Sequence, residues 1–428
     1  MLNTLKINIS DLDIGMYVSG LDRPWLETPF LTQGFLIESR EDIEQLREYC
    51  NYVLVDGRKS RQRSSILKRK VRKTQASPNA ELVPSVGTNY SGRSRIPAGQ
   101  IFDNRTIKPY HDKSDWKDER PLAQKAVDTL VEDINEIFSQ VSDGGRINII
   151  KLKKSIEPIV DSITRNPDAC LWVSRLKNHD EYTYQHSLGS AIWSVSLGRQ
   201  LGLPRHDLRS LAMGCMLMDV GKLRVDTKLL KAKRKLNLEE TAQMAGHVSY
   251  GLEIIKESGL MNQDVIDMVA HHHERFDGTG YPNGLTENQI PAFARIAAIV
   301  DTYDAVTSQR SYAPAISPAE AIRLLYKSRD EDFQAELVEA FIQAVGIYPA
   351  GTLVELSSGE VGVVVAEYRT HRLRPKVMLL LDKAKNELPV PKVIDLQEDS
   401  ASDDIEALTI TKGLDPDAYG IDLSKVDF

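Results

Sequence analysis

Residues 263–285, QDVIDMVAHHHERFDGTGYPNGL, join an apolar helical stripe to three consecutive histidines and a glycine-rich turn. The apolar positions that recur at helical spacing are Val265, Met268 and Val269. Continuing this face at 3.6 residues per turn places His272 on the stripe and His273 on its edge, whereas His271 falls on the polar side. The segment therefore predicts a helix that turns imidazole rings toward a buried core.

Four other segments place one polar residue on an apolar helical stripe in the same way. They are YTYQHSLGSAIWSVSL (182–197) with His186, LRSLAMGCMLMDVGK (208–222) with Asp219, ETAQMAGHVSYGLEII (240–255) with His247, and AFARIAAIVDTYDAV (292–306) with Asp301. A single inward histidine is more often a hydrogen-bonded core residue than a ligand. Burying an ionised carboxylate without a partner, however, costs several kcal/mol or more, and no lysine or arginine on these stripes is spaced to pair both acids. Four imidazoles and two carboxylates around a divalent cation satisfy the whole set, and such mixed ligands suit Fe, Mn, Zn, Co or Ni.

The composition is that of an ordinary globular protein. The chain has 428 residues, of which 41% are hydrophobic and 27% charged, and its net charge of -7 gives no whole-chain nucleic-acid signal. The three cysteines are few and scattered, which favours a reducing compartment over a disulfide framework. The chain starts without a signal-peptide pattern and has no apolar run of membrane-spanning length, so we expect a cytoplasmic location with no membrane span.

Changes in hydrophobic period divide the chain into five parts and predict a mainly α fold. The expected parts are a small α+β N-terminal domain (1–57), a basic, Ser/Gly/Pro-rich linker (58–120), a helical domain (121–345), a small β unit (346–396) and an acidic, loosely ordered tail (397–428). The linker begins with RKSRQRSSILKRKVRK (58–73), which could contact an anionic surface or nucleic acid. It lacks the interleaved aromatic residues that stack on bases, so we interpret it as a solvated linker.

Together these motifs resemble the HD-GYP family, a subgroup of the HD metal-dependent phosphohydrolases. The matching stretches are YTYQHS (182–187), MDVGK (218–222), HVSYG (247–251), HHERFDGTGYPNGL (272–285) and IVDTYDAVTSQRSY (299–312). The resemblance implies a helical HD-type bundle that uses Fe or Mn ions to hydrolyse cyclic di-GMP, a bacterial second messenger, to the linear dinucleotide or mononucleotides. Some members prefer cyclic GMP–AMP. The N-terminal segment is similar to a small domain of unassigned role that often precedes HD-GYP domains.

Carried over by position, the resemblance implies a role for each motif residue. The metal ligands would be His186, Asp219, His247, His272, His273 and Asp301. Asp219 and Lys222 would be catalytic, and the substrate would contact Lys222, Arg310, Tyr281, Arg275 and Asp277. The loop that contains Tyr281 would serve substrate recognition or bind signalling partners such as diguanylate cyclase-type proteins. Its glycines allow positive φ angles and close backbone approach. Tyr281 itself could stack on a guanine or pack on the bundle.

Three positions depart from the family pattern. Met218 replaces the histidine of the namesake His–Asp pair, and a thioether is a weak ligand for Fe(II) or Mn(II). Tyr182 replaces a glutamate that some members use for a third metal, so we expect one or two ions. Ala313 replaces a second basic residue. We therefore keep, beside an active cyclic-dinucleotide phosphodiesterase, a catalytically degenerate regulator that binds cyclic dinucleotides or proteins, and a phosphohydrolase of another nucleotide.

Overall fold

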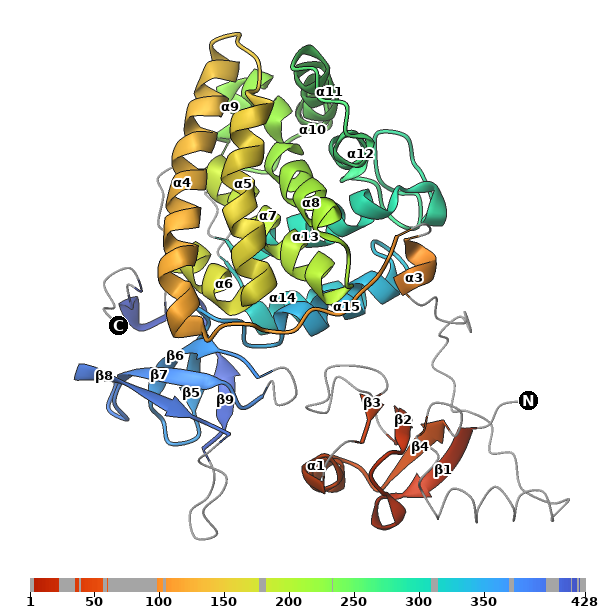
Figure 1. Ribbon diagram of the computed structural model, residues 1–428, viewed down its shortest axis with the longest axis vertical. Helices are drawn as coiled ribbons and strands as arrows, with labels where there is room; N and C mark the ends of the chain where they lie inside the picture. The colour runs from red at the N-terminus through yellow and green to blue at the C-terminus, as the bar shows by residue number, and fades with distance from the viewer. Residues whose placement is uncertain are drawn as a thin grey trace, which may run out of the picture. The chain divides into compact units, whose positions relative to one another are not determined.

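The computed structural model describes residues 4–22, 35–37, 40–56, 60, 98–102, 105–176, 182–232, 234–308, 315–368, 373–397, 408–416, 418–421 and 423. The chain divides into two compact units, Met1–Arg95 and Ile96–Phe428. Figure 1 shows both, and each is described by itself.

In its described residues the first unit is a small antiparallel sheet with one helix, which agrees with the predicted α+β content. Its strands are β1 (Thr4–Asn8), β2 (Tyr17–Leu21), β3 (Phe35–Leu36) and β4 (Tyr52–Asp56), in the order β1-β4-β2-β3, and its helix is α1 (Arg40–Tyr49). Burial alternates along β2 and β4, so every second side chain enters one core. That core includes Ile7, Val18, Leu46 and Val53.

The second unit is dominated by helices. They are α3 (Ala98–Ile101), α4 (Trp116–Ser142), α5 (Ile149–Arg165), α6 (Pro167–Leu176), α7 (Tyr182–Gln200), α8 (Arg205–Leu217), α9 (Thr227–Leu230), α10 (Leu238–Ala245), α11 (His247–Glu257), α12 (Gln263–His271), α13 (Ala292–Thr307), α14 (Pro318–Lys327) and α15 (Ala335–Val345). A 3-10 helix, Val220–Arg224, follows α8. The prediction of a mainly α chain is confirmed.

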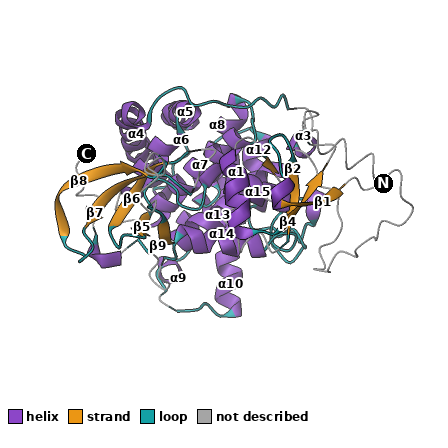
Figure 2. Ribbon diagram, turned by 90° about the horizontal axis from the view of Figure 1, so that it is seen from below, coloured by secondary structure: helices purple, strands orange, loops and turns teal. Residues whose placement is uncertain are grey.

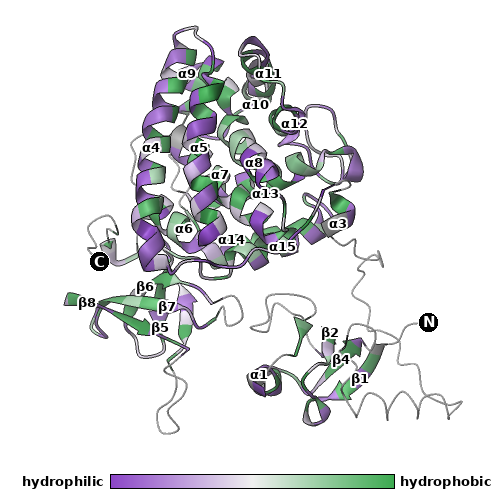
Figure 3. Cartoon of the chain, viewed as in Figure 1, coloured by the Kyte–Doolittle hydropathy of each residue, from purple (hydrophilic) through white to green (hydrophobic). Residues whose placement is uncertain are grey.

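Helix α7 forms the centre of the bundle. It packs against α8, α13 and α15, and every residue from His186 to Arg199 is buried. A helix buried on all sides has no polar face. Figure 3 shows hydrophobic and hydrophilic stretches alternating along α4 and α5, as expected of helices with one face in the core. The predicted ligands lie in or next to five helices that pack against one another, namely α7, α8, α11, α12 and α13.

The linker was predicted to extend to residue 120, but the structured part of the second unit begins before that residue. Residues 105–115 lie against the bundle, and α4 begins at Trp116 rather than after residue 120. The Tyr110 hydroxyl donates to the carbonyl of Leu203 over 2.9 Å, and Arg105 Nε lies 2.9 Å from Asp207 Oδ2. Because the Asp207 side chain is fully buried, it requires a cationic partner, which Arg105 supplies. Apart from Ser60, the basic run at 58–73 lies outside the described residues.

The end of the second unit is a five-stranded antiparallel sheet, which we call the C-terminal β unit (residues 346–368, 373–397 and 408–413). Its strands are β5 (Leu353–Leu356), β6 (Val361–Ala366), β7 (Lys376–Leu381), β8 (Glu387–Asp395) and β9 (Ile410–Gly413), in the order β8-β7-β6-β5-β9. A hairpin turn at 357–360 joins β5 to β6, and Gly359 has the positive φ of 86° that the turn requires. Figure 2 shows the strands of this sheet gathered beside the helices rather than among them.

One segment of the predicted acidic tail is a strand. Strand β9 pairs with β5, and Lys412 Nζ lies 2.9 Å from Glu355 Oε2. Ile410 and Leu408 pack on the core of the sheet, which explains why this short stretch is ordered although its surroundings are acidic. Among the described residues, no helix combines the length and hydropathy that crossing a membrane requires.

Candidate metal centre

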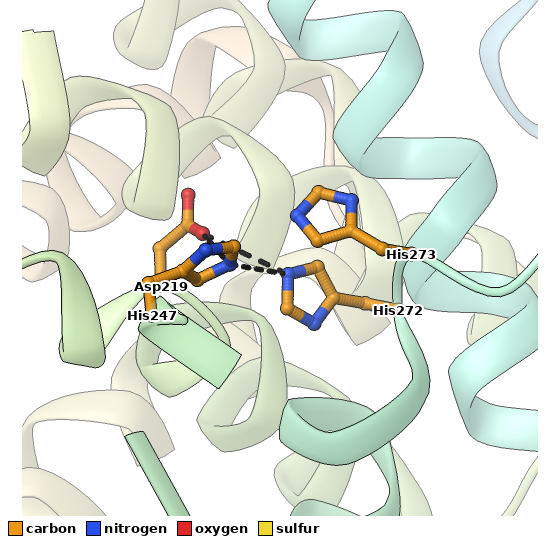
Figure 4. A group of neighbouring side chains, drawn as sticks. All are labelled: Asp219, His247, His272 and His273. Carbon is orange, nitrogen blue, oxygen red and sulfur yellow. Dashed lines mark hydrogen bonds and ion pairs between the residues drawn. The ribbon is translucent and has the colours of Figure 1, made fainter. Parts of the chain in front are cut away.

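The structure brings all six predicted ligands together. They form two overlapping groups in which the potential ligand atoms lie within 4.8 Å of one another. One group is Asp219, His247, His272 and His273, and the other is His186, Asp219 and Asp301. Figure 4 shows the side chains of the first group turned toward a common point. Asp219 belongs to both groups and therefore lies at their junction.

Asp219 is buried where α8 ends and the 3-10 helix begins. Its Oδ2 accepts a hydrogen bond from Lys222 Nζ over 2.6 Å, whereas its Oδ1 has no hydrogen-bond partner among the described residues. Burial by itself would raise the pKa of this carboxyl, but Lys222 and the neighbouring imidazoles hold it well below the usual value. The result is a buried carboxylate with one oxygen directed at a cluster of imidazole nitrogens.

Backbone carbonyls fix the orientation of two of these imidazoles. His247 Nδ1 donates to the Met244 carbonyl over 2.6 Å, and His272 Nδ1 lies 3.1 Å from the Met268 carbonyl. Each ring thereby presents its Nε2 lone pair to Asp219 Oδ1, at 3.4 Å for His247 and 3.7 Å for His272. Burial lowers the pKa of His247 to about 4, so that ring is neutral at physiological pH. A neutral ring with its other nitrogen anchored is the form of histidine that binds metals.

His273 belongs to the same group and is less deeply buried than His247 and His272. Burial and the nearby His272 lower its pKa well below the usual value, which favours the neutral ring. Tyr281 stacks on it, with ring centroids 4.7 Å apart and an interplanar angle of 28°. The packing of this tyrosine, which the sequence left open, is therefore against a predicted metal ligand.

The second group is built around His186. Its Nε2 lies 2.8 Å from Asp301 Oδ1 and 3.8 Å from Asp219 Oδ2. Burial alone would lower the pKa of His186, but hydrogen bonds with Asp301 and Asp304 raise it to about 10. The carboxylates thus require a positive charge at this point, and a proton or a metal cation can supply it.

Sequence reasoning missed Asp304. Its Oδ2 accepts from His186 Nδ1 over 2.8 Å, and its Oδ1 accepts from Trp193 Nε1 over 3.1 Å. A Cβ on Gly189 would lie 2.0 Å from Asp304 Oδ1, so only glycine leaves room for this contact. The available signal was the spacing of Asp301 and Asp304, which share one face of α13 at i and i+3.

These features fit a divalent cation. A buried carboxylate oxygen without a partner faces Nε2 atoms whose rings are held by backbone carbonyls, and a second set of carboxylates raises the pKa of a buried imidazole. Mixed nitrogen and oxygen donors at this density are typical of transition-metal sites.

The glycine-rich loop after His273 is organised by a second residue that the sequence did not single out. The buried carboxylate of Glu274 accepts the backbone N–H groups of Asn283 and Leu285, over 2.8 and 3.0 Å. A Cβ on Gly280 would lie 2.3 Å from the backbone nitrogen of Arg275, so the loop folds back on its own start. The loop that carries Tyr281 is therefore pinned to the metal centre by Glu274.

The other predicted substrate residues have different surroundings. Arg275 lies over the ring of Phe333, with its Cζ 5.3 Å from the ring centroid. The exposed carboxylate of Asp277 accepts from the backbone and hydroxyl of Thr279, which lowers its pKa and shapes the turn. Arg310 lies outside the described residues. Met218 is fully buried beside Asp219 at the end of α8.

Three known families match the chain. Residues 172–337 match the HD domain, residues 4–151 a domain of unknown function (DUF3391), and residues 353–412 a KOW domain associated with HD domains. The HD match contains all six predicted ligands.

Curated relatives are similar over the whole chain or over the helical domain. The cyclic di-GMP phosphodiesterase PA4108 of Pseudomonas aeruginosa is 32% identical over 403 residues, which cover 94% of this chain and 91% of that protein. The 3′3′-cGAMP-specific phosphodiesterase 2 of Vibrio cholerae is 27% identical and covers 57% of this chain and 48% of that protein. The cyclic di-GMP phosphodiesterase response regulator RpfG of Xanthomonas campestris is 35% identical, covering 34% of this chain and 39% of that protein.

Proposed function

The chain belongs to the HD-GYP family of metal-dependent phosphodiesterases that act on cyclic dinucleotides, and from this premise we propose that it hydrolyses cyclic di-GMP at the centre described above. The observation that carries the proposal is that the other five predicted ligands, which lie in or next to α7, α11, α12 and α13, are all grouped with Asp219. The choice of cyclic di-GMP over cyclic GMP–AMP follows the relative that is similar along nearly the entire chain.

We propose that Asp219 would contribute to two metal positions of different chemistry. The first would have three imidazoles and one carboxylate, and the second would have His186 with Asp219 and Asp301. Nitrogen-rich sites favour Fe(II), whereas carboxylate-rich sites suit Mn(II). A bound divalent cation supplies positive charge to the phosphate oxygens and lowers the pKa of a bound water.

The residues around the centre would bind and orient the phosphodiester. Lys222 holds Asp219 but keeps 24% of its side chain exposed, so its ammonium group can also approach a phosphate oxygen. Burial raises the pKa of the Tyr281 phenol, so the hydroxyl stays protonated and can donate a hydrogen bond to the same group. Arg310 would contact a second oxygen of the same phosphodiester, and Arg275 would contact the substrate.

The loop at 277–285 would have a second role as a partner surface. Asp277, Thr279, Pro282 and Asn283 are exposed on it, and Glu274 holds its backbone in place. An ordered, exposed loop suits recognition of a signalling protein, and a diguanylate cyclase-type domain is the partner we propose. A cytoplasmic location is part of the same proposal, because cyclic dinucleotides are made and degraded inside the cell.

The test is hydrolysis by the full chain, purified without oxygen and supplied with Fe(II) or Mn(II). We expect conversion of cyclic di-GMP that exceeds conversion of cyclic GMP–AMP. Asp219→Asn should lower the rate by at least about 100-fold, because removing a ligand costs more than removing a ligand's hydrogen-bond partner. Asp267→Asn on α12 is the matched control and should retain activity. A metal-loaded protein that cleaves neither dinucleotide would contradict the proposal.

Met218 supports a second candidate function. Because the namesake histidine is absent, the centre could hold a cyclic dinucleotide without hydrolysing it. Tight binding of cyclic di-GMP without turnover, together with turnover in Met218→His, would identify the natural protein as a regulator descended from an enzyme. Turnover by the unmodified protein would exclude this candidate.

A further inference from the structure

The C-terminal β unit reaches the metal centre through a series of side-chain contacts. In Figure 1 the sheet lies at the end of the bundle near α6, at the opposite end from α10 and α11. Helix α6 contacts β6 directly, and the Glu367 backbone N–H donates to Asp168 Oδ2 of α6 over 3.1 Å. The sheet is therefore attached to the helix that carries Arg175.

The first contact is between Gly351 and Arg175. Gly351 lies two residues before β5 and has a φ of 88°, and a Cβ there would lie 2.8 Å from Arg175 Cδ. The glycine backbone thus covers the aliphatic part of the arginine side chain. Nε of Arg175 is buried without a hydrogen-bond partner among the described residues, and the charge of Arg175 also acts on Tyr303.

The second contact joins Arg175 to α7. Its guanidinium carbon lies 5.4 Å from the centroid of the Trp193 ring, within the range of a cation–π interaction. Trp193 is also held edge-on by Tyr303, with centroids 5.0 Å apart. The indole is therefore fixed from two sides, one of which depends on the β unit.

The third contact links Trp193 to the metal centre through Asp304. Trp193 Nε1 donates to Asp304 Oδ1, and Asp304 Oδ2 accepts from His186 Nδ1. The opposite nitrogen of His186 faces Asp301 and Asp219. Carboxylates that hold the far nitrogen of a ligating histidine set its orientation and strengthen metal binding.

We propose that the C-terminal β unit positions His186 for metal binding through Gly351, Arg175, Trp193 and Asp304. This inference rests on the proposed metal centre and assigns the β unit a role in it. Arg175 and Trp193 are positioning residues, because neither lies among the potential metal ligands.

The matched pair Gly351→Ala and Gly359→Ala tests the role of the sheet. Both glycines have a φ near 87° (88° and 86°), but a Cβ on Gly359 would meet nothing within 4 Å. We expect both variants to lose similar stability from the strained φ. Only Gly351→Ala should weaken Co(II) binding, by about 3- to 10-fold, and change the visible spectrum of the Co(II)-loaded protein. Equal affinities and spectra in the two variants would overturn the proposal.

A double-mutant cycle tests the path itself. Arg175→Met and Trp193→Phe should each weaken Co(II) binding, and the double variant should be no weaker than Trp193→Phe alone, because Arg175 acts through the indole. Arg175→Lys should restore binding. Lys376→Met, which removes a partly exposed cation over the Tyr368 ring in the β unit, is the control and should leave affinity unchanged. If the fold-losses of Co(II) affinity in the two single variants multiply in the double variant, Arg175 and Trp193 act independently and the proposed path is wrong. Failure of the unmodified protein to bind Co(II) would instead reject the proposed function.

Discussion

At the scale of single residues, two tightly packed glycines of α7 differ in what they contact: one touches a partner of a predicted metal ligand and the other touches only leucine side chains. A Cβ on Gly189 would meet the Asp304 carboxylate at 2.0 Å, whereas a Cβ on Gly198 would meet Leu211 and Leu208 methyl groups at 2.6 and 2.7 Å. Overpacking of either site is expected to cost about 1–3 kcal/mol of unfolding free energy. We predict that Gly189→Ala also weakens metal binding, since it displaces the partner of His186, and that Gly198→Ala does not.

Denaturant unfolding and a metal titration of both variants check this prediction. Equal metal affinity in the two variants would show that Asp304 has no influence on the centre.

The ligands themselves could be predicted residue by residue, because each is a polar residue on an apolar helical stripe. His272 and Asp219 are both buried, as this pattern required. Asp304 also lies on the buried face of α13, but it was missed because its reason for being buried is a hydrogen bond to His186, 118 residues away in sequence. The i, i+3 spacing from Asp301 was visible in the sequence, but spacing within one helix does not reveal a hydrogen-bond partner on another helix.

At the scale of elements, the glycine-rich loop depends on one buried carboxylate. Glu274 accepts the N–H groups of Asn283 and Leu285, and hydrogen bonds to a charged group contribute about 1.5–3 kcal/mol each. We predict that Glu274→Gln loosens the loop, lowers the unfolding free energy by about 1–3 kcal/mol and raises the KM for cyclic di-GMP more than it lowers kcat. The reason is that Tyr281 would lose its fixed position over His273.

Steady-state kinetics with thermal unfolding measure both effects. Glu253→Gln, which removes an exposed carboxylate paired with Arg224, is the control and should change neither. An unchanged KM in Glu274→Gln would mean that the loop does not bind substrate.

Two elements were assigned wrongly from the sequence for a shared reason. Residues 105–115 were predicted to be linker and β9 to be tail, because short polar segments have no period of their own. Each is ordered by partners elsewhere: Arg105 by the buried Asp207, and β9 by pairing with β5.

At the scale of the whole molecule, the metal centre is expected to stabilise the helical bundle. The predicted ligands lie in or next to five helices, and within the described part of the chain Lys222 and imidazoles balance the charges of Asp219 and Asp301. A ligand that binds only the folded state at 100 times its Kd adds about 2.7 kcal/mol of stability. Chelation should therefore lower the Tm of the metal-loaded protein by several degrees, and added Mn(II) should restore it.

The Asp219→Asn variant is the internal control for that measurement, because its Tm should not respond to metal. A Tm of the unmodified protein that is the same with and without chelator would argue against a metal shared by these helices.

The sequence by itself determined the helical bundle, the two flanking α+β and β regions, and the six polar side chains expected to face the core. These properties are local, since helical and strand periods and buried polar residues are visible within 20 residues. Only the tertiary structure decided that Asp219 joins both ligand groups, that Tyr281 stacks on His273, and that Asp304 connects His186 to Trp193. Those relations depend on the way helices distant in sequence pack, which no single helix encodes.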